Sequence, residues 1–511
     1  MAMRILHPVP LLLASLLLGC EHDGLLLQLL FDDAEATPDH LLITVAYPGE
    51  LPRFTYADWS PAQRYLRINR RSLAYPPGKL EVLREGAELV RIDIDGWRAS
   101  DQGCDTTTSP NMRRITHTGS RPIPHWQPSI GWVSPWPLEM KSKPGEHACA
   151  LDIEPDDDKT DPPRLNSLAA GPLGNDAWLV GSDARMYYLT YLPENYAAWK
   201  LTRIDLNYME LTCGKGHADL RSISSAGTGK DHLAFAVGSC GTVIKYSDEQ
   251  PTARWTQELG TQLADEPQCP KSDISAIEKT DDLNQVLVRN DDIWIVGESE
   301  STDGPTGVLY HSARNRAQTN CAQWSRETPM NPVCAISYFD STAGWAKGAW
   351  IGDNQGHAIQ WMGAMFPNNP MGTINEMRCI AEVIYIDNQV VLLGDHIKQG
   401  RESNLIAIPE PRKPASINSS MEMFGPIVFP NGSHSVALVI DRAGHTAVLG
   451  TAGIVPAAQS DIPTPMANEI ITAAIFLSNA PKSANKAHNL LFLFNGKYSS
   501  VRVGNAPFSL D

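Results

Sequence analysis

The sequence predicts an all-β protein, with a β-propeller of about seven blades over residues 165–511 preceded by a small β-sandwich-like domain. The first observation is a repeated apolar phrase that ends at or near glycine, as in Ala177-Trp178-Leu179-Val180-Gly181. The second is its spacing, because successive copies begin 41 to 59 residues apart, which suits one four-stranded blade per copy. The third is the alternation of apolar and polar residues across residues 38–100, which is typical of antiparallel strands.

Each copy of the phrase is predicted to form the second strand of a blade. The copies begin at Ala177, Ala234, Ile293, Ala349, Val390, Val436 and Leu490. Inner strands bury both faces between blades and so read as continuous apolar runs, and the glycine is expected to let the hairpin turn without a Cβ clash. The segment before Arg164 is expected to donate a strand that closes the ring. Six or eight blades, and an array of stacked β-sandwiches, stay open.

Tryptophans and one turn carry a resemblance to known propellers. Trp199, Trp255 and Trp324 close their repeats and are expected to fill gaps between neighbouring outer strands. The best copy runs from Gly238-Ser239-Cys240-Gly241 through Tyr246-Ser247-Asp248 to Trp255. Over about residues 165–365 the chain resembles the BNR and photosystem II assembly factor families of propellers, although the glycine expected after Asp248 is missing. The resemblance implies a fold, and one fold hosts many unrelated tasks.

The first twenty residues have the layout of an export signal. Arg4 precedes an apolar run from Val9 to Leu18, and Leu17-Leu18-Gly19-Cys20 resembles the lipobox of bacterial lipoproteins. The resemblance implies that residues 1–19 are a signal peptide and that Cys20 is lipidated, which anchors the chain in the bacterial cell envelope, at the outer membrane or cell surface more than the inner membrane. An ordinary secretion signal is the alternative. The apolar run is too short to span a bilayer.

The remaining cysteines suit an oxidising compartment. They are an even set, which predicts disulfides: Cys104, Cys149, Cys213, Cys240, Cys269, Cys321, Cys334 and Cys379. The connectivity stays open, although the repeat frame favours Cys321 with Cys334 and Cys104 with Cys149. No CxxC spacing supports a metal ribbon or a haem site, and no cofactor or metal is expected.

Composition divides the chain after the signal. Residues 20–37 are expected to be a tether, in which Leu25 to Phe31 is interpreted as the first strand of the following domain, with a membrane-proximal contact as the alternative. Residues 38–150 are expected to be an N-terminal β-domain with an irregular connector. Residues 151–164 are expected to be an acidic, proline-containing hinge before the propeller. Its carboxylates are also a candidate calcium loop, but Lys159 interrupts them and no glycine stands where a tight loop needs one.

Charge narrows the classes of partner. The formal net charge of −16 repels phosphate backbones, so nucleic acid is not an expected partner. The dense basic cluster Arg64, Arg67, Arg70 and Arg71 is interpreted as a solvated strand face, with lipid headgroups as the alternative. The expected partners are therefore a membrane, through the lipid anchor, and a protein or glycan.

No local signature of catalysis is present. The chain lacks GxSxG, HExxH and phosphate-binding glycine motifs. Histidines that could converge at a channel mouth are His311, His357, His396, His434 and His445. Asp353, Asp395 and Asp441 recur after second strands, as turn residues do. The sequence therefore favours a binding or scaffolding platform over an enzyme, with a sialidase-like glycan hydrolase and a structural envelope component as alternatives.

Overall fold

The computed structural model describes strands and connections between residues 24 and 504. Outside the description lie residues 1–23, 33–36, 61, 70–88, 100–113, 125–134, 143–150, 153–163, 193–197, 248–253, 258–276, 290–291, 303, 314–323, 330, 340–347, 362–371, 374–378, 387–388, 397–401, 410–414, 420–422, 432–433, 442–445, 451–452, 457–462, 464, 466–467, 478–481, 484–485, 488–489, 497–498 and 505–511. In the described residues every element is a strand except the 3-10 helix Gly229–Asp231, and none of their helices is long and apolar enough to cross a bilayer.

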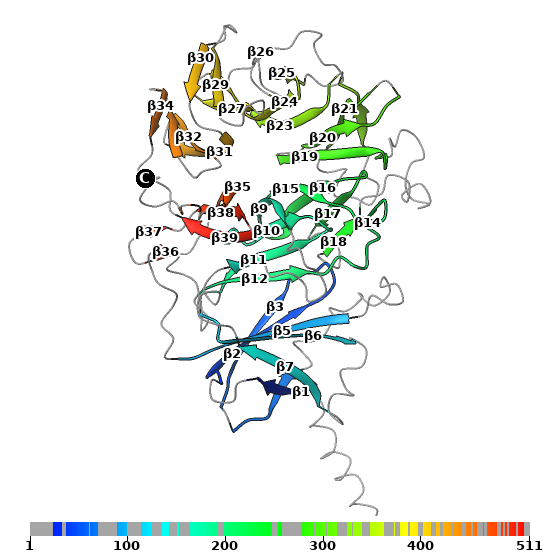
Figure 1. The fold of residues 1–511 in the computed structure, drawn as a ribbon, viewed down its shortest axis with the longest axis vertical. Coiled ribbons are helices and arrows are strands. Elements are labelled where there is room, and N and C mark those ends of the chain that lie inside the picture. Colours follow the sequence, from blue (N-terminus) through cyan, green and yellow to red (C-terminus); the bar gives the residue numbers. More distant parts are fainter. Residues whose placement is uncertain are drawn as a thin grey trace, which may run out of the picture. The chain divides into compact units, whose positions relative to one another are not determined.

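The chain forms two compact units. Residues 1–103 and 113–149 make the first, and residues 104–112 and 150–511 make the second. Figure 1 labels most strands of both units.

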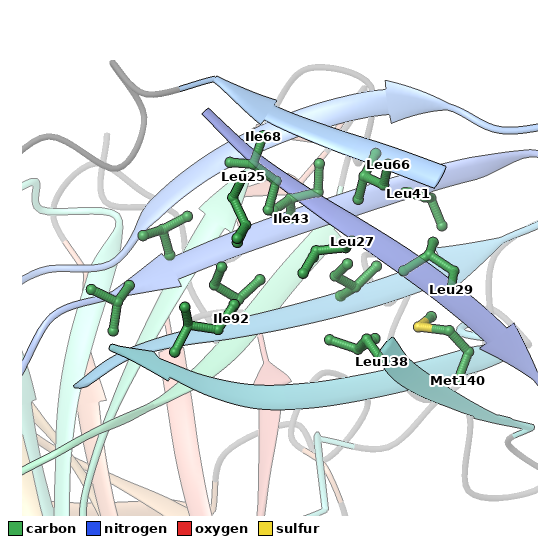
Figure 2. Close-up of a cluster of buried hydrophobic side chains, with 14 of the residues drawn as sticks. Leu25, Leu27, Leu29, Leu41, Ile43, Leu66, Ile68, Ile92, Leu138 and Met140 are labelled. Atoms are coloured by element: carbon green, nitrogen blue, oxygen red, sulfur yellow. The ribbon is translucent and has the colours of Figure 1, made fainter. Parts of the chain in front are cut away.

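The described strands of the first unit form one curled seven-stranded sheet, in the order β3-β2-β5-β6-β7-β1-β4. They are β1 (Gly24–Phe31), β2 (His40–Ala46), β3 (Arg53–Asp58), β4 (Tyr65–Asn69), β5 (Leu89–Trp97), β6 (His117–Pro124) and β7 (Trp136–Ser142). Strand β1 runs parallel to β7, and the other pairs are antiparallel. The apolar side chains gather on one face, where leucines of β1 pack with residues of β2, β4, β5 and β7 (Figure 2).

Residues 25–31 lie in strand β1, so the interpretation of this segment as a strand is confirmed. Leu25, Leu27 and Leu29 are buried in the core, while Leu26 and Gln28 between them are partly exposed. This period of two is what a half-buried strand requires. The segment is the first strand of the unit, so Gly24–Phe31 of the stretch expected as a tether belongs to the sheet.

The second unit contains, in its described residues, seven four-stranded antiparallel sheets. Their first strands are β9 (Leu165–Ala170), β15 (Leu220–Ala226), β19 (Asp281–Arg289), β23 (Val333–Phe339), β27 (Cys379–Ile386), β31 (Met423–Asn431) and β35 (Ile470–Phe476). The second strands are β10 (Asp176–Gly181), β16 (Leu233–Gly238), β20 (Asp292–Ser299), β24 (Gly348–Asp353), β28 (Gln389–His396), β32 (His434–Asp441) and β38 (Leu490–Asn495). All seven copies of the repeated phrase form second strands, as predicted.

Third and fourth strands complete the sheets. The third strands are β11 (Met186–Leu192), β17 (Val243–Ser247), β21 (Thr306–Ala313), β25 (His357–Gln360), β29 (Glu402–Pro409), β33 (Thr446–Gly450) and β39 (Ser499–Gly504). The fourth strands are β12 (Ala198–Ile204), β18 (Arg254–Gln257), β22 (Ser325–Glu327), β26 (Gly372–Thr373), β30 (Ala415–Ser419), β34 (Gly453–Pro456) and, in the last sheet, β8 (Leu151–Asp152).

The seven first strands follow one another in a closed series. Each contacts the first strand of the next sheet, and β35 of the last sheet contacts β9 of the first. Strand β8, which precedes the whole series in the chain, pairs with β39 through Leu151 and Asp152. A strand from before the repeats thus completes the last sheet, as the sequence led us to expect, and the unit has a β-propeller-like repeat fold.

A β-bulge near the start of the first strand recurs in all seven sheets. One residue of each first strand has no partner on the second strand, and these residues are Asn166, Arg221, Asn284, Cys334, Ala381, Phe424 and Thr472. A bulge turns the extra side chain away from the ladder.

The bulge explains the glycine that ends the repeated phrase. A Cβ on Gly238 would lie 1.8 Å from the carbonyl oxygen of Asp219, and one on Gly181 2.1 Å from that of Arg164. The expected reason was a hairpin turn, and the structure corrects it. The glycine permits close approach of the second strand to the start of the first, and it is the following residues, such as Cys240 at φ 54°, that turn the chain.

The three repeat-closing tryptophans are buried between sheets. Trp255 packs edge-on against Trp178 of β10, with ring centroids 5.3 Å apart, and Trp324 packs edge-on against Phe235 of β16 at 5.9 Å. In both cases the partner lies on the second strand of the preceding sheet. The tryptophans therefore fill space between sheets, as expected, but against second strands instead of outer ones.

Candidate functional site

A short hairpin projects between the first and second sheets of the repeat unit. Its strands are β13 (Thr212–Cys213) and β14 (Gly216–His217), joined through Gly214 at φ 61°. Residues 214 to 217 are exposed, Lys215 and His217 among them. The connection from β12 to β15 thus carries polar side chains outward from the end of the sheets at which the first strands begin. We call this end the bulge face.

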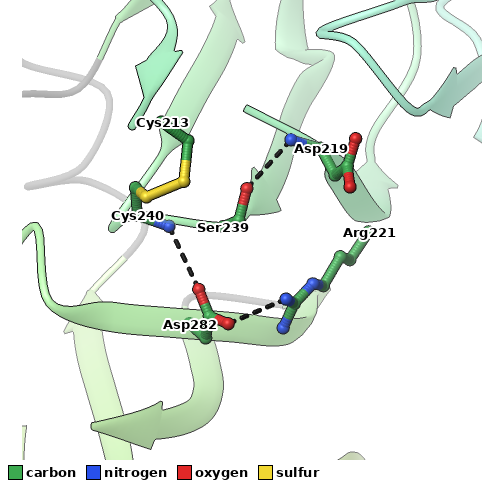
Figure 3. Close-up of a disulfide and its surroundings, with 6 residues drawn as sticks. All are labelled: Cys213, Asp219, Arg221, Ser239, Cys240 and Asp282. Atoms are coloured by element: carbon green, nitrogen blue, oxygen red, sulfur yellow. Dashed lines mark hydrogen bonds and ion pairs between the residues drawn. A yellow bond between two sulfur atoms is a disulfide. The ribbon is translucent and has the colours of Figure 1, made fainter. Parts of the chain in front are cut away.

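A disulfide fastens the hairpin to the turn of the second sheet. Cys213 and Cys240 are bonded, with their Cα atoms 5.6 Å apart and 27 residues apart in sequence (Figure 3). Cys240 lies in the turn between β16 and β17. The exposed loop is therefore held in place covalently, and pre-organisation of this kind lowers the entropy lost when a loop binds a partner.

Three sheets meet beneath the disulfide through polar bonds. The carboxylate of Asp282, on the first strand of the third sheet, accepts from the Cys240 N–H at 3.2 Å and from Arg221 Nη2 at 2.8 Å (Figure 3). Arg221 also donates to Asn284 Oδ1 at 2.9 Å. The exposed Asp219 accepts a hydrogen bond at 3.0 Å from the backbone N–H of Asp183, which belongs to the first sheet. At the bulge face, hydrogen bonds therefore connect the first three sheets to one another.

Small polar side chains continue this joining inside the ring. Ser222 Oγ accepts from the Val286 N–H at 3.3 Å, Ser224 Oγ from the Val288 N–H at 3.0 Å, and Gln285 Oε1 from the Ile336 N–H at 2.6 Å. The bulge residues Asn166 and Asn284 act as donors instead, and their side-chain amides bond to backbone carbonyl oxygens of the next sheet. First strands are edge strands with unpaired backbone groups, and these side chains satisfy them.

Two of the eight cysteine candidates are joined in the Cys213–Cys240 bond, a pairing the sequence left open. Cys334 is disulfide-bonded as well. Its expected partner Cys321 lies outside the described residues, as do Cys20, Cys104, Cys149 and Cys269, and the side chain of Cys379 is not described. The Cys321–Cys334 and Cys104–Cys149 pairings and the lipidation of Cys20 remain predictions.

Of the histidines expected at a channel mouth, the two with described side chains, His311 and His357, each have a local carboxylate partner. His311 Nε2 lies 2.7 Å from Asp292 Oδ1, and His357 Nδ1 lies 2.8 Å from Asp353 Oδ2. Asp353 also accepts the N–H groups of Gln355 and His357, which is the turn role expected for it. His396 and His434 lie in β28 and β32 without described side chains, and His445 lies outside the described residues. His311 and His357 belong to different pairs and do not converge.

One cluster contains the residue types of a sialidase-like site. Tyr310 donates its hydroxyl proton to Asp281, and Arg326 contacts both, with Nε 3.1 Å from the tyrosine oxygen. Tyr310 and Asp281 are fully buried, and burial raises the pKa of Tyr310 far above its ordinary value. A buried neutral tyrosine in this position joins strands and offers no face to a substrate.

A second buried carboxyl, that of Asp176, lies in the first sheet at the end away from the bulge face. Asp176 accepts from the Tyr188 hydroxyl at 2.5 Å and from the Leu173 N–H at 2.8 Å. Burial raises the pKa of Asp176 to about 6, although both hydrogen bonds act to lower it. Within the described part of the chain, no three His, Cys, Asp or Glu side chains are placed to hold a metal ion.

Comparisons with known proteins show no family for the chain. No protein-family model and no curated protein matches it. Among solved structures, a chain from the "Crystal Structure of Mitotic Checkpoint Complex" is similar over 71% of this chain and 99% of its own, at 9% identity and a TM-score of 0.40.

Sequence reasoning missed the projecting hairpin and the bulge contacts. The hairpin had a local signal, the glycines of Cys213-Gly214-Lys215-Gly216, but its strands are only two residues long. The bulge residues vary from Asn to Arg to Cys, so no residue type marks the position. A register shift is set by pairing with the second strand, which a single sequence does not display.

Proposed function

We propose that the protein is an exported, lipid-anchored binding or scaffolding platform of the bacterial cell envelope. Its repeat unit would be a seven-bladed β-propeller, and its N-terminal unit, with its single curled sheet, would follow the anchor along the chain. Cys20 would carry the lipid, and the bulge face would contact a protein or a glycan.

The observation that carries the binding role is the braced hairpin 212–217. It is exposed, polar and fixed by a disulfide to a turn that is itself bonded to the next sheet. Loops held by a rigid scaffold are where binding residues concentrate. The Arg221–Asp282 pair behind it offers both a guanidinium and a carboxylate, groups suited to the amide and hydroxyl groups of peptides and sugars.

Affinity purification of the mature protein from solubilised envelope tests the binding role. Lys215→Glu changes the tip of the hairpin, and Lys230→Glu makes the same change at the opposite end of the second sheet, where Lys230 is also exposed. We expect a co-purifying protein or glycan to be lost with Lys215→Glu and kept with Lys230→Glu. Equal recovery with both variants would remove the hairpin from the proposal.

The anchor is tested separately. Cys20→Ser removes the thiol to which the lipid would be attached, so this variant should leave the membrane fraction while the parent stays in it. Partitioning of the variant like the parent would contradict the anchor and leave the binding role untouched.

A further inference from the structure

We infer that the outward side of strands β1 and β4 lies against an anionic lipid surface when the protein is anchored. This rests on the proposed lipidation of Cys20. We call the surface the β1–β4 outer face and define it by Leu26, Gln28, Leu30, Tyr65 and Arg67.

The register of the two strands places these side chains together. Leu25 faces Ile68 and Leu27 faces Leu66, and all four are buried in the core. The alternate pairs, Leu26 with Arg67 and Gln28 with Tyr65, therefore project from the other side of the sheet. Leu30 is two residues beyond Gln28 and so is a diagonal neighbour of Tyr65 on that side.

The outer face exposes two large apolar side chains, Leu30 and Tyr65. Four large apolar residues of the described chain are exposed: Leu30 (42%), Tyr65 (47%), Leu173 (58%) and Ile470 (40%). Both of those in the first unit, Leu30 and Tyr65, lie on this face. A tyrosine and a leucine that are neighbours on the outer side of a sheet form an exposed apolar patch, and a contiguous patch of this kind is a candidate surface for membrane contact.

Basic side chains border the apolar pair. Arg64 precedes Tyr65 and is exposed, Arg67 is exposed in β4, and Lys141 is exposed on β7, the strand on the other side of β1. Glu139 of β7 pairs with Leu30 of β1, and its negative charge offsets part of the positive charge of these basic residues. Tyrosine at the level of the headgroups with Arg and Lys around it is the composition of a membrane interface.

The length of chain before β1 favours a bilayer over a protein as the occupant. Strand β1 begins at Gly24, four residues after Cys20. Four residues span at most about 14 Å. Gly24 and Asn69, which faces it in β4, would therefore be held within about 14 Å of the acylated residue, at the height of the lipid headgroups.

Oxidative footprinting of the lipidated full-length protein tests this inference. The protein is placed on vesicles of phosphatidylglycerol and phosphatidylcholine and compared with the Cys20→Ser chain in solution. We expect oxidation of Leu30 and Tyr65 to fall about threefold or more, because interfacial burial removes most of their contact with water. Leu173, exposed in the second unit, is the internal control and should react equally in both samples.

Further variants and conditions show whether a lipid surface or a second copy of the chain covers the β1–β4 outer face. Arg67→Glu should restore oxidation of Tyr65 on vesicles containing phosphatidylglycerol more than on pure phosphatidylcholine, since a basic residue near an anionic surface strengthens binding about fivefold. Unchanged oxidation of Leu30 and Tyr65 on vesicles overturns the inference, and so does protection of the vesicle-free chain that grows with its concentration, which indicates a second copy. Absence of an acyl mass on Cys20 instead overturns the anchor on which the inference rests.

Discussion

Arg221 and Asp282 join the first strands of two successive sheets, with Nη2 and Oδ2 2.8 Å apart. Both side chains are about one-third exposed, so the ion pair itself contributes at most about 1 kcal/mol. The pair matters because of where its two residues lie. Arg221 is the bulge residue of its strand, and Asp282 also holds the turn that carries the disulfide. Ring assembly and presentation of the hairpin therefore depend on the same residues.

Replacing Gly238 with alanine should destabilise the repeat unit strongly. The added Cβ would lie 1.8 Å from the backbone oxygen of Asp219, which cannot move without displacing the first strand. We expect the free energy of unfolding to fall by about 3 kcal/mol, as for other overpacked sites. Gly216→Ala is the matched control, because nothing lies within 4 Å of its Cβ. Urea denaturation of both variants gives the comparison, and equal stability would refute the close-approach explanation.

Ser222→Ala should leave the Val286 N–H without an acceptor. The residue is buried, so water does not replace the hydroxyl, and the cost should be about 1 to 3 kcal/mol. Thr302→Ala on an exposed turn should change stability by less than about 0.5 kcal/mol. Hydrogen exchange of the Val286 amide should accelerate in the first variant alone. Unaltered exchange there would show that the serine does not bridge the sheets.

Asp176 should make stability fall between about pH 4 and about pH 6. Its pKa is 3.8 in the unfolded chain and is raised by burial to about 6 in the folded protein. The folded state then binds more protons in this window, so the free energy of unfolding decreases as pH rises, by up to about 3 kcal/mol, and is constant above it. Asp176→Asn cannot ionise and should lose this contribution. Parallel stability curves for parent and variant across the window would contradict the assignment.

Opening the Cys213–Cys240 bond should destabilise the second sheet and free the hairpin. The bond closes a loop whose ends are 27 residues apart, for which chain entropy predicts about 3 to 4 kcal/mol. A Cys213→Ser, Cys240→Ser double variant should lower the melting temperature, and limited proteolysis should then cut near Lys215. A chain that resists cleavage at Lys215 without the bond would show that the hairpin is held by other contacts.

The repeated second strands could be predicted because one physical demand marks each of them. Where their side chains are described, these strands are buried on both faces, and several approach the first strand at a glycine, as at Gly238. Apolar runs such as Ile293 to Gly297 therefore recur at blade spacing. Strand β8 was expected only as a closing segment, because two residues in an acidic stretch carry no strand pattern of their own. The bulge contacts and the Cys213–Cys240 bond depend on which strands become neighbours, so local sequence does not encode them.

The central claim is that the series of sheets closes through β8 and β39, and a cross-link tests it most directly. Leu151 faces Val501 in that pair, and directly opposed antiparallel residues are within reach of a disulfide. Mass spectrometry of the Leu151→Cys, Val501→Cys chain should find one peptide joining the two positions. The Leu151→Cys, Arg502→Cys chain, whose second cysteine points to the other side of β39, should give none. No joined peptide in the first chain, or equal yields in both, would contradict closure of the ring.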